Sequence, residues 1–206
     1  MPARQNKPVM SLVILALFSL SLSMEAYTAS EKGEYNVRGA GNLSCKVYEQ
    51  EREKRSPAYF VTAGWVEGYI TATSRNSLDT YDITSFESTE LIMELISKHC
   101  QKHAGDKVFY VLGYLLTGLY EDRLTVPSEK KRITVGEHST ALYQETMRRI
   151  QARLKEKGYY SGMLDGDFGP MSAKAIAEFQ RSLGFKGTGF PDQATLWKLM
   201  RTPGSK

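Results

Sequence analysis

The sequence predicts an all-α protein made of two small helical domains joined by a polar linker. Two groups of helical patterns support this fold class. Apolar residues recur at spacings of three and four over about 57–119 and again after about residue 139. Between them, residues 123–138 are mostly polar and charged and lose this periodicity. We therefore expect a first domain at 43–122, a linker at 123–138 and a second domain at 139–203.

Three helices are predicted in the first domain. The first runs from Pro57 to about Thr73, and proline suits the first turn of a helix. The second begins near Ser88 and ends at Cys100. The third follows Asp106, whose carboxylate can cap it. The apolar stripes of these helices are expected to form the core.

The second domain also shows three short helical patterns. Ser139–Thr140 can cap the first of them, and Gly158 is placed to end it. Pro170 suits the start of the second, which Gly184 would end. A third short helix runs from about Asp192. Three short helices with glycine-rich connections predict a small bundle.

The first 23 residues resemble a secretory signal peptide. Arg4 and Lys7 precede the uncharged run 9–22, which is short for a membrane span of roughly 20 residues. The alternative is an uncleaved N-terminal anchor. A signal peptide implies export to the periplasm or cell envelope, with membrane contact only during export.

The charge of the chain differs between its two halves. The formal net charge is +4, but residues 24–122 carry 10 basic and 15 acidic residues, whereas residues 123–206 carry 15 basic and 8 acidic ones. A chain that is acidic in one half and basic in the other is typical of two modules. We therefore expect no nucleic-acid partner, although the pI is about 8.9.

Two cysteines in an exported chain favour a disulfide between Cys45 and Cys100. The alternative uses His99, Cys100 and His103 as metal ligands, because residues 100 and 103 share a helix face. A closed zinc site needs four ligands, and the third histidine, His138, falls in the expected linker. We predict the disulfide, with no metal and no cofactor.

The segment 158–170 is dense in glycine, tyrosine and aspartate. Its four glycines permit backbone conformations that are closed to other residues, and Asp165 and Asp167 can bond neighbouring amides. A calcium loop of the EF-hand type would need an acidic residue at loop position 12, where Ile176 stands. Calcium is therefore not expected.

A larger set of residues extends this pattern over about 55 positions. The set is Ile150, Gln151, Leu154, Gly158, Tyr159, Tyr160, Gly162, Asp165, Gly166, Phe168, Gly169, Ser172, Ala175, Ile176, Phe179, Gln180, Gly184, Gly189, Asp192, Thr195 and Leu199. It resembles the peptidoglycan-binding domain of the type 1 three-helix family, with Ser172 where that family usually has threonine. The resemblance implies an all-α module that binds peptidoglycan near the glycine- and aspartate-rich loop.

The expected binding residues lie in this loop and beside it. Basic side chains and an exposed helix N-terminus would attract the carboxylates of stem peptides, and tyrosine rings offer flat faces to sugars. The alternative is that Tyr159, Phe168 and Phe179 are core residues and only the loop backbone binds. The candidate site comprises Tyr159, Tyr160, Asp165, Gly166, Asp167, Phe168, Gly169, Ser172, Lys174 and Arg181.

A weaker resemblance covers residues 43–120. Cys45-x-x-Tyr48, Trp65-x-x-Gly68-Tyr69, Tyr81-Asp82 and Cys100 are similar to the exported domains of HdeA-like acid-stress chaperones and of related immunity proteins. The pairing in those families supports the disulfide. They usually continue with Asn-Pro, whereas Gln101-Lys102 follows here, so acid-triggered chaperone activity is only a hypothesis.

These observations predict an exported, non-enzymatic cell-wall protein. Its second domain would bind peptidoglycan and hold the first, which would act on a protein partner. The alternative is a small peptidoglycan hydrolase with an unrecognised catalytic domain. Glu67, between Trp65 and Gly68, is the one acid that we would test for catalysis.

Overall fold

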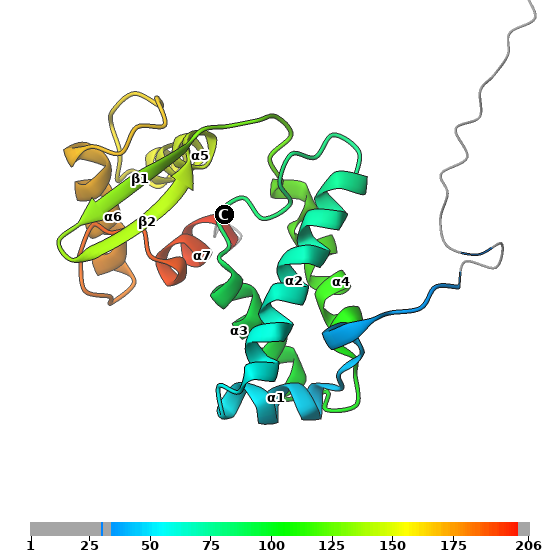
Figure 1. Cartoon of the computed structure of the whole chain (residues 1–206). Coiled ribbons are helices and arrows are strands. Elements are labelled where there is room, and N and C mark those ends of the chain that lie inside the picture. Colours follow the sequence, from blue (N-terminus) through cyan, green and yellow to red (C-terminus); the bar gives the residue numbers. More distant parts are fainter. Residues whose placement is uncertain (1–29, 31–33, 202–206) are drawn as a thin grey trace, which may run out of the picture. The chain divides into compact units, whose positions relative to one another are not determined.

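The computed structural model describes residue 30 and residues 34–201, and these are mainly helical (Figure 1). The predicted helical fold class is confirmed, with one two-stranded hairpin added. The predicted signal peptide at 1–23 lies outside the described residues. The elements are η1 (Gly39–Asn42), α1 (Cys45–Glu53), α2 (Pro57–Asn76), α3 (Thr89–Cys100), α4 (Val108–Leu119), η2 (Tyr120–Asp122), β1 (Lys130–Val135), β2 (His138–Tyr143), α5 (Gln144–Glu156), α6 (Pro170–Ser182) and α7 (Gln193–Arg201).

The chain divides into two units between Asn36 and Val37, and of the first unit the structure describes residue 30 and residues 34–36. In the first, the Glu34 amide donates a hydrogen bond of 3.1 Å to the Ser30 hydroxyl. The second unit holds every helix and strand named above. Among the described residues, no helix is long and apolar enough to cross a membrane.

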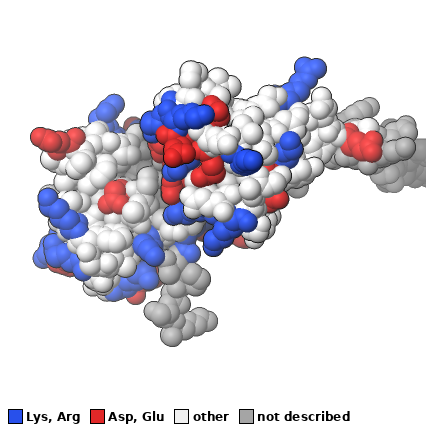
Figure 2. Space-filling model, turned by 90° about the horizontal axis from the view of Figure 1, so that it is seen from below, with Lys and Arg blue, Asp and Glu red and all other residues white. Residues whose placement is uncertain are grey.

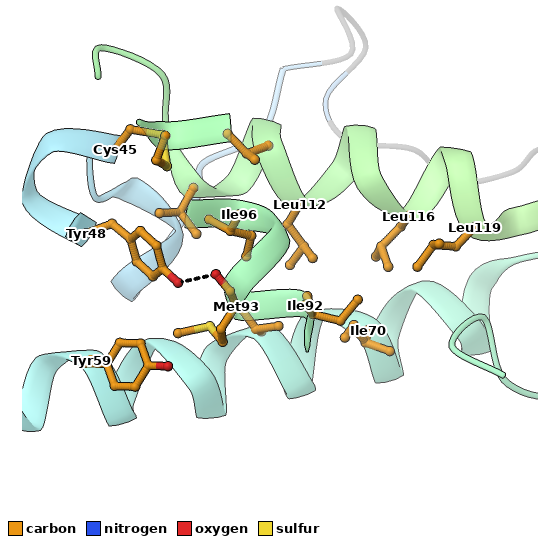
Figure 3. Packing of buried hydrophobic residues seen from close by; sticks show 14 of the residues in the cluster. Cys45, Tyr48, Tyr59, Ile70, Ile92, Met93, Ile96, Leu112, Leu116 and Leu119 are labelled. Carbon is orange, nitrogen blue, oxygen red and sulfur yellow. Dashed lines mark hydrogen bonds between the residues drawn. A yellow bond between two sulfur atoms is a disulfide. The ribbon is translucent and has the colours of Figure 1, made fainter. Parts of the chain in front are cut away.

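The first hydrophobic cluster is built around α3, which packs against α1, α2 and α4 (Figure 3). Ile92, Ile96 and Leu112 are fully buried in it. The Tyr48 hydroxyl donates a 2.7 Å hydrogen bond to the Met93 carbonyl, and burial raises the pKa of this phenol. This buried hydrogen bond links α1 to α3 within a mainly apolar core.

The predicted disulfide between Cys45 and Cys100 is present. It joins the start of α1 to the end of α3 across 55 residues of chain. In the chain-entropy picture, a closed loop of this length stabilises the fold by about 4 kcal/mol. The competing metal site that used Cys100 is therefore wrong as stated, because its sulfur is bonded to another sulfur.

Helix ends in this part follow the sequence in two of three cases. Helix α2 begins at Pro57 and α3 begins next to Ser88, as expected, and the structure adds that Ser56 and Ser88 are their N-caps. The third expectation is wrong, because Lys107 takes the N-cap position of α4. The Asp106 carboxylate lies instead 2.7 Å from the His99 Nε2 atom.

Helix α1 was not predicted from the sequence. It has nine residues, Cys45–Glu53, of which only Cys45 and Tyr48 are buried. A helix of this length shows too few apolar positions for its periodicity to be recognised. The residue that could have revealed it is Ser44, whose hydroxyl accepts a hydrogen bond from the Val47 amide.

The segment expected to be an irregular linker contains an antiparallel hairpin. Strand β1 pairs with β2 from Lys130 opposite Tyr143 to Val135 opposite His138. Gly136 turns the chain with a φ of +59°, which favours glycine. The expectation of a solvated linker is therefore wrong for residues 130–138, because Ile133 of this hairpin is buried in the second hydrophobic cluster. The domain boundaries stay predictions.

The hairpin also moves the start of the next helix. Ser139 and Thr140 were expected to cap a helix, but they lie in β2, and α5 begins at Gln144. The other expected boundaries agree with the structure: Gly158 and Gly184 follow the ends of α5 and α6 with positive φ, and Pro170 starts α6. Helix α5 packs on α6, α7 and β2.

The loop between α2 and α3 contributes to the second hydrophobic cluster. Its Phe86 is 5% exposed and packs with residues of α5, α6 and α7. The next residue, Glu87, has a fully buried side chain that pairs with Arg201 of α7. Ser85 accepts a 2.7 Å hydrogen bond from the Thr146 hydroxyl on its carbonyl oxygen. A loop of the first predicted domain thus completes the core of the second.

Candidate functional site

A buried glutamine organises the glycine- and aspartate-rich loop. Gln151 of α5 is fully buried, and its Nε2 donates to Asp165 Oδ1 at 2.9 Å and to the Asp167 carbonyl at 3.0 Å. Its Oε1 accepts from the Gly166 amide at 2.9 Å. The same Nε2 lies 3.3 Å from the Ser172 hydroxyl. One side chain therefore fixes both the turn of the loop and the start of α6.

Gly166 is the position where this turn requires glycine. Its φ is +75°, and a Cβ there would lie 2.4 Å from the Gln144 carbonyl oxygen. Both the backbone conformation and the space exclude a side chain.

The next loop has the same construction. Gln180 of α6 is 1% exposed, and its Nε2 donates to the Phe190 carbonyl at 2.9 Å and to the Thr195 hydroxyl at 3.1 Å. Its Oε1 accepts from the Gly189 amide at 2.9 Å. In both loops the glycine precedes the bonded hydroxyl residue by six positions. The domain therefore contains the same arrangement twice: a buried glutamine that holds a loop glycine and the hydroxyl residue of the next helix.

The two loops differ at the start of the helix that follows. In the second loop, Asp192 Oδ1 accepts from the Thr195 amide at 2.8 Å and so caps α7. The matching position in the first loop is Gly169, the N-cap of α6, which offers no such acceptor. Among the described residues, no atom lies within 4 Å of a Cβ placed on Gly169. Pro170 has no N–H, and the Ala173 amide donates to the Gly169 carbonyl. The donors left for an external anion at the start of α6 are therefore the Met171 and Ser172 amides.

Two carboxylates stand at the first loop. The hydrogen bond from Gln151, together with one from the Asp167 amide, holds the pKa of Asp165 below its usual value. Asp167 forms a 2.6 Å ion pair with Lys131 of β1, and this hydrogen bond raises the pKa of Lys131. The Asp165 carboxylate is therefore charged at neutral pH, and Asp167 links the loop to the hairpin.

Six of the ten expected binding residues line one of two hollows. One, of about 300 Å³, is lined by Tyr159, Tyr160 and Lys174 together with residues of the loop and α6. The other, of about 180 Å³, lies between the loop and the hairpin and includes Gly166, Asp167 and Phe168. Gly169 and Pro170 connect the loop to α6.

Several expected site residues also have structural contacts. Tyr160 is 8% exposed, and its hydroxyl donates to the Met163 carbonyl at 2.7 Å. Tyr159 is partly buried and packs edge-on against Phe179. Ser172 is 2% exposed, beneath the loop. Arg181 is exposed and lies beside Gly187, outside the residues that line either hollow.

Sequence reasoning did not single out the residues that hold this site together. Gln151 and Gln180 were part of the family pattern but received no role. The signal that could have found them is the repeat of an apolar-Gln pair followed by glycine and, six positions later, by serine or threonine. Lys131 and Arg132, which line the smaller hollow, were assigned to the linker.

The surface charge is mixed on the face shown in Figure 2. Lys and Arg side chains lie interspersed with Asp and Glu and with uncharged surface. Opposite charges also pair along single helices, as Arg148 does with Glu145, and this hydrogen bond lowers the pKa of the glutamate. A surface of this kind differs from the continuous basic stripe that nucleic-acid binding favours.

Comparison with known proteins identifies the C-terminal part. Residues 143–199 match the family model described as "Putative peptidoglycan binding domain", which covers α5, both glutamine-held loops and α6. This stretch of the chain therefore belongs to a family of peptidoglycan-binding domains, as the sequence resemblance implied.

One curated protein shares a similar stretch. N-acetylmuramoyl-L-alanine amidase CwlM of Mycobacterium tuberculosis (strain ATCC 25618 / H37Rv) is 36% identical over 58 residues. The match spans 28% of this chain and 14% of the relative. No solved structure matches the chain.

Proposed function

We propose that this chain is an exported, non-enzymatic cell-wall protein that binds peptidoglycan through residues 139–203 and keeps residues 43–122 at the wall. The observation that carries the proposal is the family match over 143–199, in the part of the chain where a buried glutamine fixes the loop. The periplasm or cell envelope is the compartment that contains this polymer and permits a disulfide.

The larger hollow supports a contact with the stem peptide. Lys174 is exposed at its edge, 4.0 Å from Glu178, and the uncapped start of α6 belongs to the same helix. A peptide carboxylate near this end would meet both a cationic side chain and free amides. Tyr159 adds a partly buried ring on which a sugar or a methyl group can pack.

Binding to purified sacculi tests the proposal directly. The full chain is incubated with sacculi, pelleted and quantified, and we expect Lys174→Ala to weaken binding by about two- to fivefold, the effect of one exposed charge contact. Lys198→Ala is the matched control, because Lys198 is also an exposed helical lysine of this domain but is not among the residues lining the hollow. Absence of wild-type binding would contradict the proposal.

A hydrolase is the second candidate, and two observations favour testing it. The relative that shares 58 residues is named an amidase. In addition, Glu67 and Asp82 both line a cleft of about 570 Å³ in the described part of the chain. The Glu67 carboxylate already accepts a hydrogen bond from the Thr89 hydroxyl. Release of soluble fragments from labelled sacculi, abolished by Glu67→Gln, would support this candidate and contradict a non-enzymatic protein.

A further inference from the structure

The turn after α3 brings together three side chains that commonly bind metals. His99 lies in the last turn of α3, and His103 and Asp106 follow in the turn before α4. One ligand atom from each residue lies within 4.8 Å of the other two. His99 is partly buried, whereas His103 and Asp106 are exposed, so an ion can reach the cluster from solvent.

The backbone holds the two imidazoles on the same side of the chain. The His103 amide donates to the His99 carbonyl at 3.1 Å, which continues the helical pattern for one more turn. The two rings stack with centroids 4.5 Å apart and an angle of 30° between their planes. Two imidazoles in this arrangement can turn their ring nitrogens toward one ion.

The third ligand is fixed by the disulfide region. The Asp106 carbonyl accepts a 2.7 Å hydrogen bond from the Cys45 amide, and Cys45 is bonded to Cys100. The Asp106 amide donates to the His103 carbonyl at 3.1 Å. Covalent and backbone bonds therefore hold the segment 100–106 in place at both ends. Because the segment is already ordered in the folded chain, binding a ligand there would cost little conformational entropy.

We propose that His99, His103 and Asp106 bind a divalent transition-metal ion of the zinc class. Imidazole and carboxylate are ligands that Zn²⁺ accepts readily, and three protein ligands leave a fourth position for water or an external donor. The site also lies at the C-terminal end of α3, where the helix dipole favours a cation. This set differs from the one considered on the sequence, because Asp106 replaces the bonded Cys100.

Bound metal would add a second cross-link to this turn. The disulfide already ties α1 to the end of α3, and the ion would tie the end of α3 to the residue that precedes the N-cap of α4. The open fourth position would let a carboxylate or imidazole from another molecule bind to the same ion. The site is separate from the peptidoglycan-binding domain and does not depend on it.

Titration of the full-length, disulfide-bonded chain tests the site. Tag-free protein is stripped with a chelator and titrated with ZnCl₂ by calorimetry, and we expect one equivalent to bind. Asp106→Asn and His103→Ala should each raise the dissociation constant by at least about tenfold, since even second-shell partners of metals cost 10- to 100-fold. His103 is exposed, so its removal should leave the far-UV circular dichroism unchanged.

His138→Ala is the matched control. His138 is the other exposed histidine and lies in the hairpin, where its ring packs near Phe190. We expect its removal to leave zinc binding unchanged, and we expect Co²⁺ to give visible absorption bands in this variant but not in His103→Ala. Equal affinity of the wild type and His103→Ala, or loss of binding in His138→Ala alone, would overturn the proposal.

Discussion

The two glutamine-held loops share one scaffold but differ in what they leave exposed. The loop on Gln180 ends at Asp192, which caps the helix that follows. The loop on Gln151 ends at Gly169, so the start of α6 keeps free amide donors, and it displays Asp165 and Asp167. The same glutamine-held loop can therefore precede a capped helix in one copy and an uncapped helix, accessible to a ligand, in the other.

Removing either glutamine should have the largest effect. Gln151→Ala leaves the Gly166 amide without its partner and removes one of two hydrogen bonds to the Asp167 carbonyl. Gln180→Ala likewise leaves the Gly189 amide without its partner and removes one of two hydrogen bonds to the Phe190 carbonyl. Because a buried unpaired group costs about 1–3 kcal/mol and a lost hydrogen bond about 1 kcal/mol, we expect each variant to lower the free energy of unfolding by about 2–4 kcal/mol. Urea unfolding of the full chain measures this. A loss below about 0.5 kcal/mol in one variant only would show that the loops are not equivalent.

The two loop glycines should come next. In Gly166→Ala and Gly189→Ala the new Cβ would lie 2.4 Å and 2.7 Å from carbonyl oxygens, and φ is positive at both positions. We expect losses of about 2 kcal/mol or more, measured by urea unfolding. Gly136→Ala is the control, because φ is +59° there but the surrounding space is open among the described residues, so about 1 kcal/mol should be lost. Equal losses at all three glycines would exclude a role for the close contacts.

Substitutions at the N-cap residues of α6 and α7 test whether the start of α6 takes part in binding. Asp192→Ala removes the cap of α7 and should cost about 1 kcal/mol without changing sacculus binding. Gly169→Asp should gain a few tenths of a kcal/mol by capping α6, since φ there is −135° and suits any residue.

The same Gly169→Asp variant should bind sacculi less tightly, because its carboxylate would occupy the amides that the ligand uses and would repel an anionic ligand. Thermal unfolding and the pelleting assay, run side by side, check both effects. Unchanged binding in a stabilised Gly169→Asp protein would show that the start of α6 is not part of the site.

The pH dependence of Asp165 gives the smallest expected effect. Its pKa is lowered in the folded chain by the hydrogen bond from Gln151, so its contribution to stability is present above the ordinary aspartate pKa of 3.8 and is lost as the pH falls through the folded value. Asp165→Asn should therefore be less stable than the wild type at pH 7, with the difference shrinking below pH 3.8. Urea unfolding at pH 7 and at pH 3 measures both values. A difference that does not depend on pH would contradict the role of the charged carboxylate.

Helix boundaries show where sequence reasoning works well. Pro57 and Pro170 mark helix starts through the fixed φ of proline, and Gly158 and Gly184 mark helix stops because glycine readily adopts a positive φ. Both effects are local and act whatever the neighbours are. The same reasoning failed for Asp106, because an acidic residue before a helix can cap it or bond another partner. Here His99 lies within reach, and only the folded turn shows this.

The hairpin and the candidate site depend on contacts that sequence patterns do not predict. Residues 130–143 contain many charged side chains, so their strand pairing depends on Ile133 and Leu142, which face the second cluster. Of the expected binding residues, the loop glycines and aspartates lie together around Gln151, whereas Arg181 lies apart. Lys131 of β1 joins the site only because the hairpin packs beside the loop that carries Asp167, 36 residues later in the chain.

The sequence by itself determined the helical fold class, the pairing of its two cysteines and the resemblance of residues 143–199 to a family of peptidoglycan-binding domains. These follow from periodicity, composition and local motifs, which a single segment carries. Only the tertiary structure decided that Phe86 packs in the second core beside the buried Glu87, and that a carboxylate lies near two imidazoles at the end of α3. Such contacts form between residues that are distant in sequence or free to choose among several partners, so only the packed chain selects them.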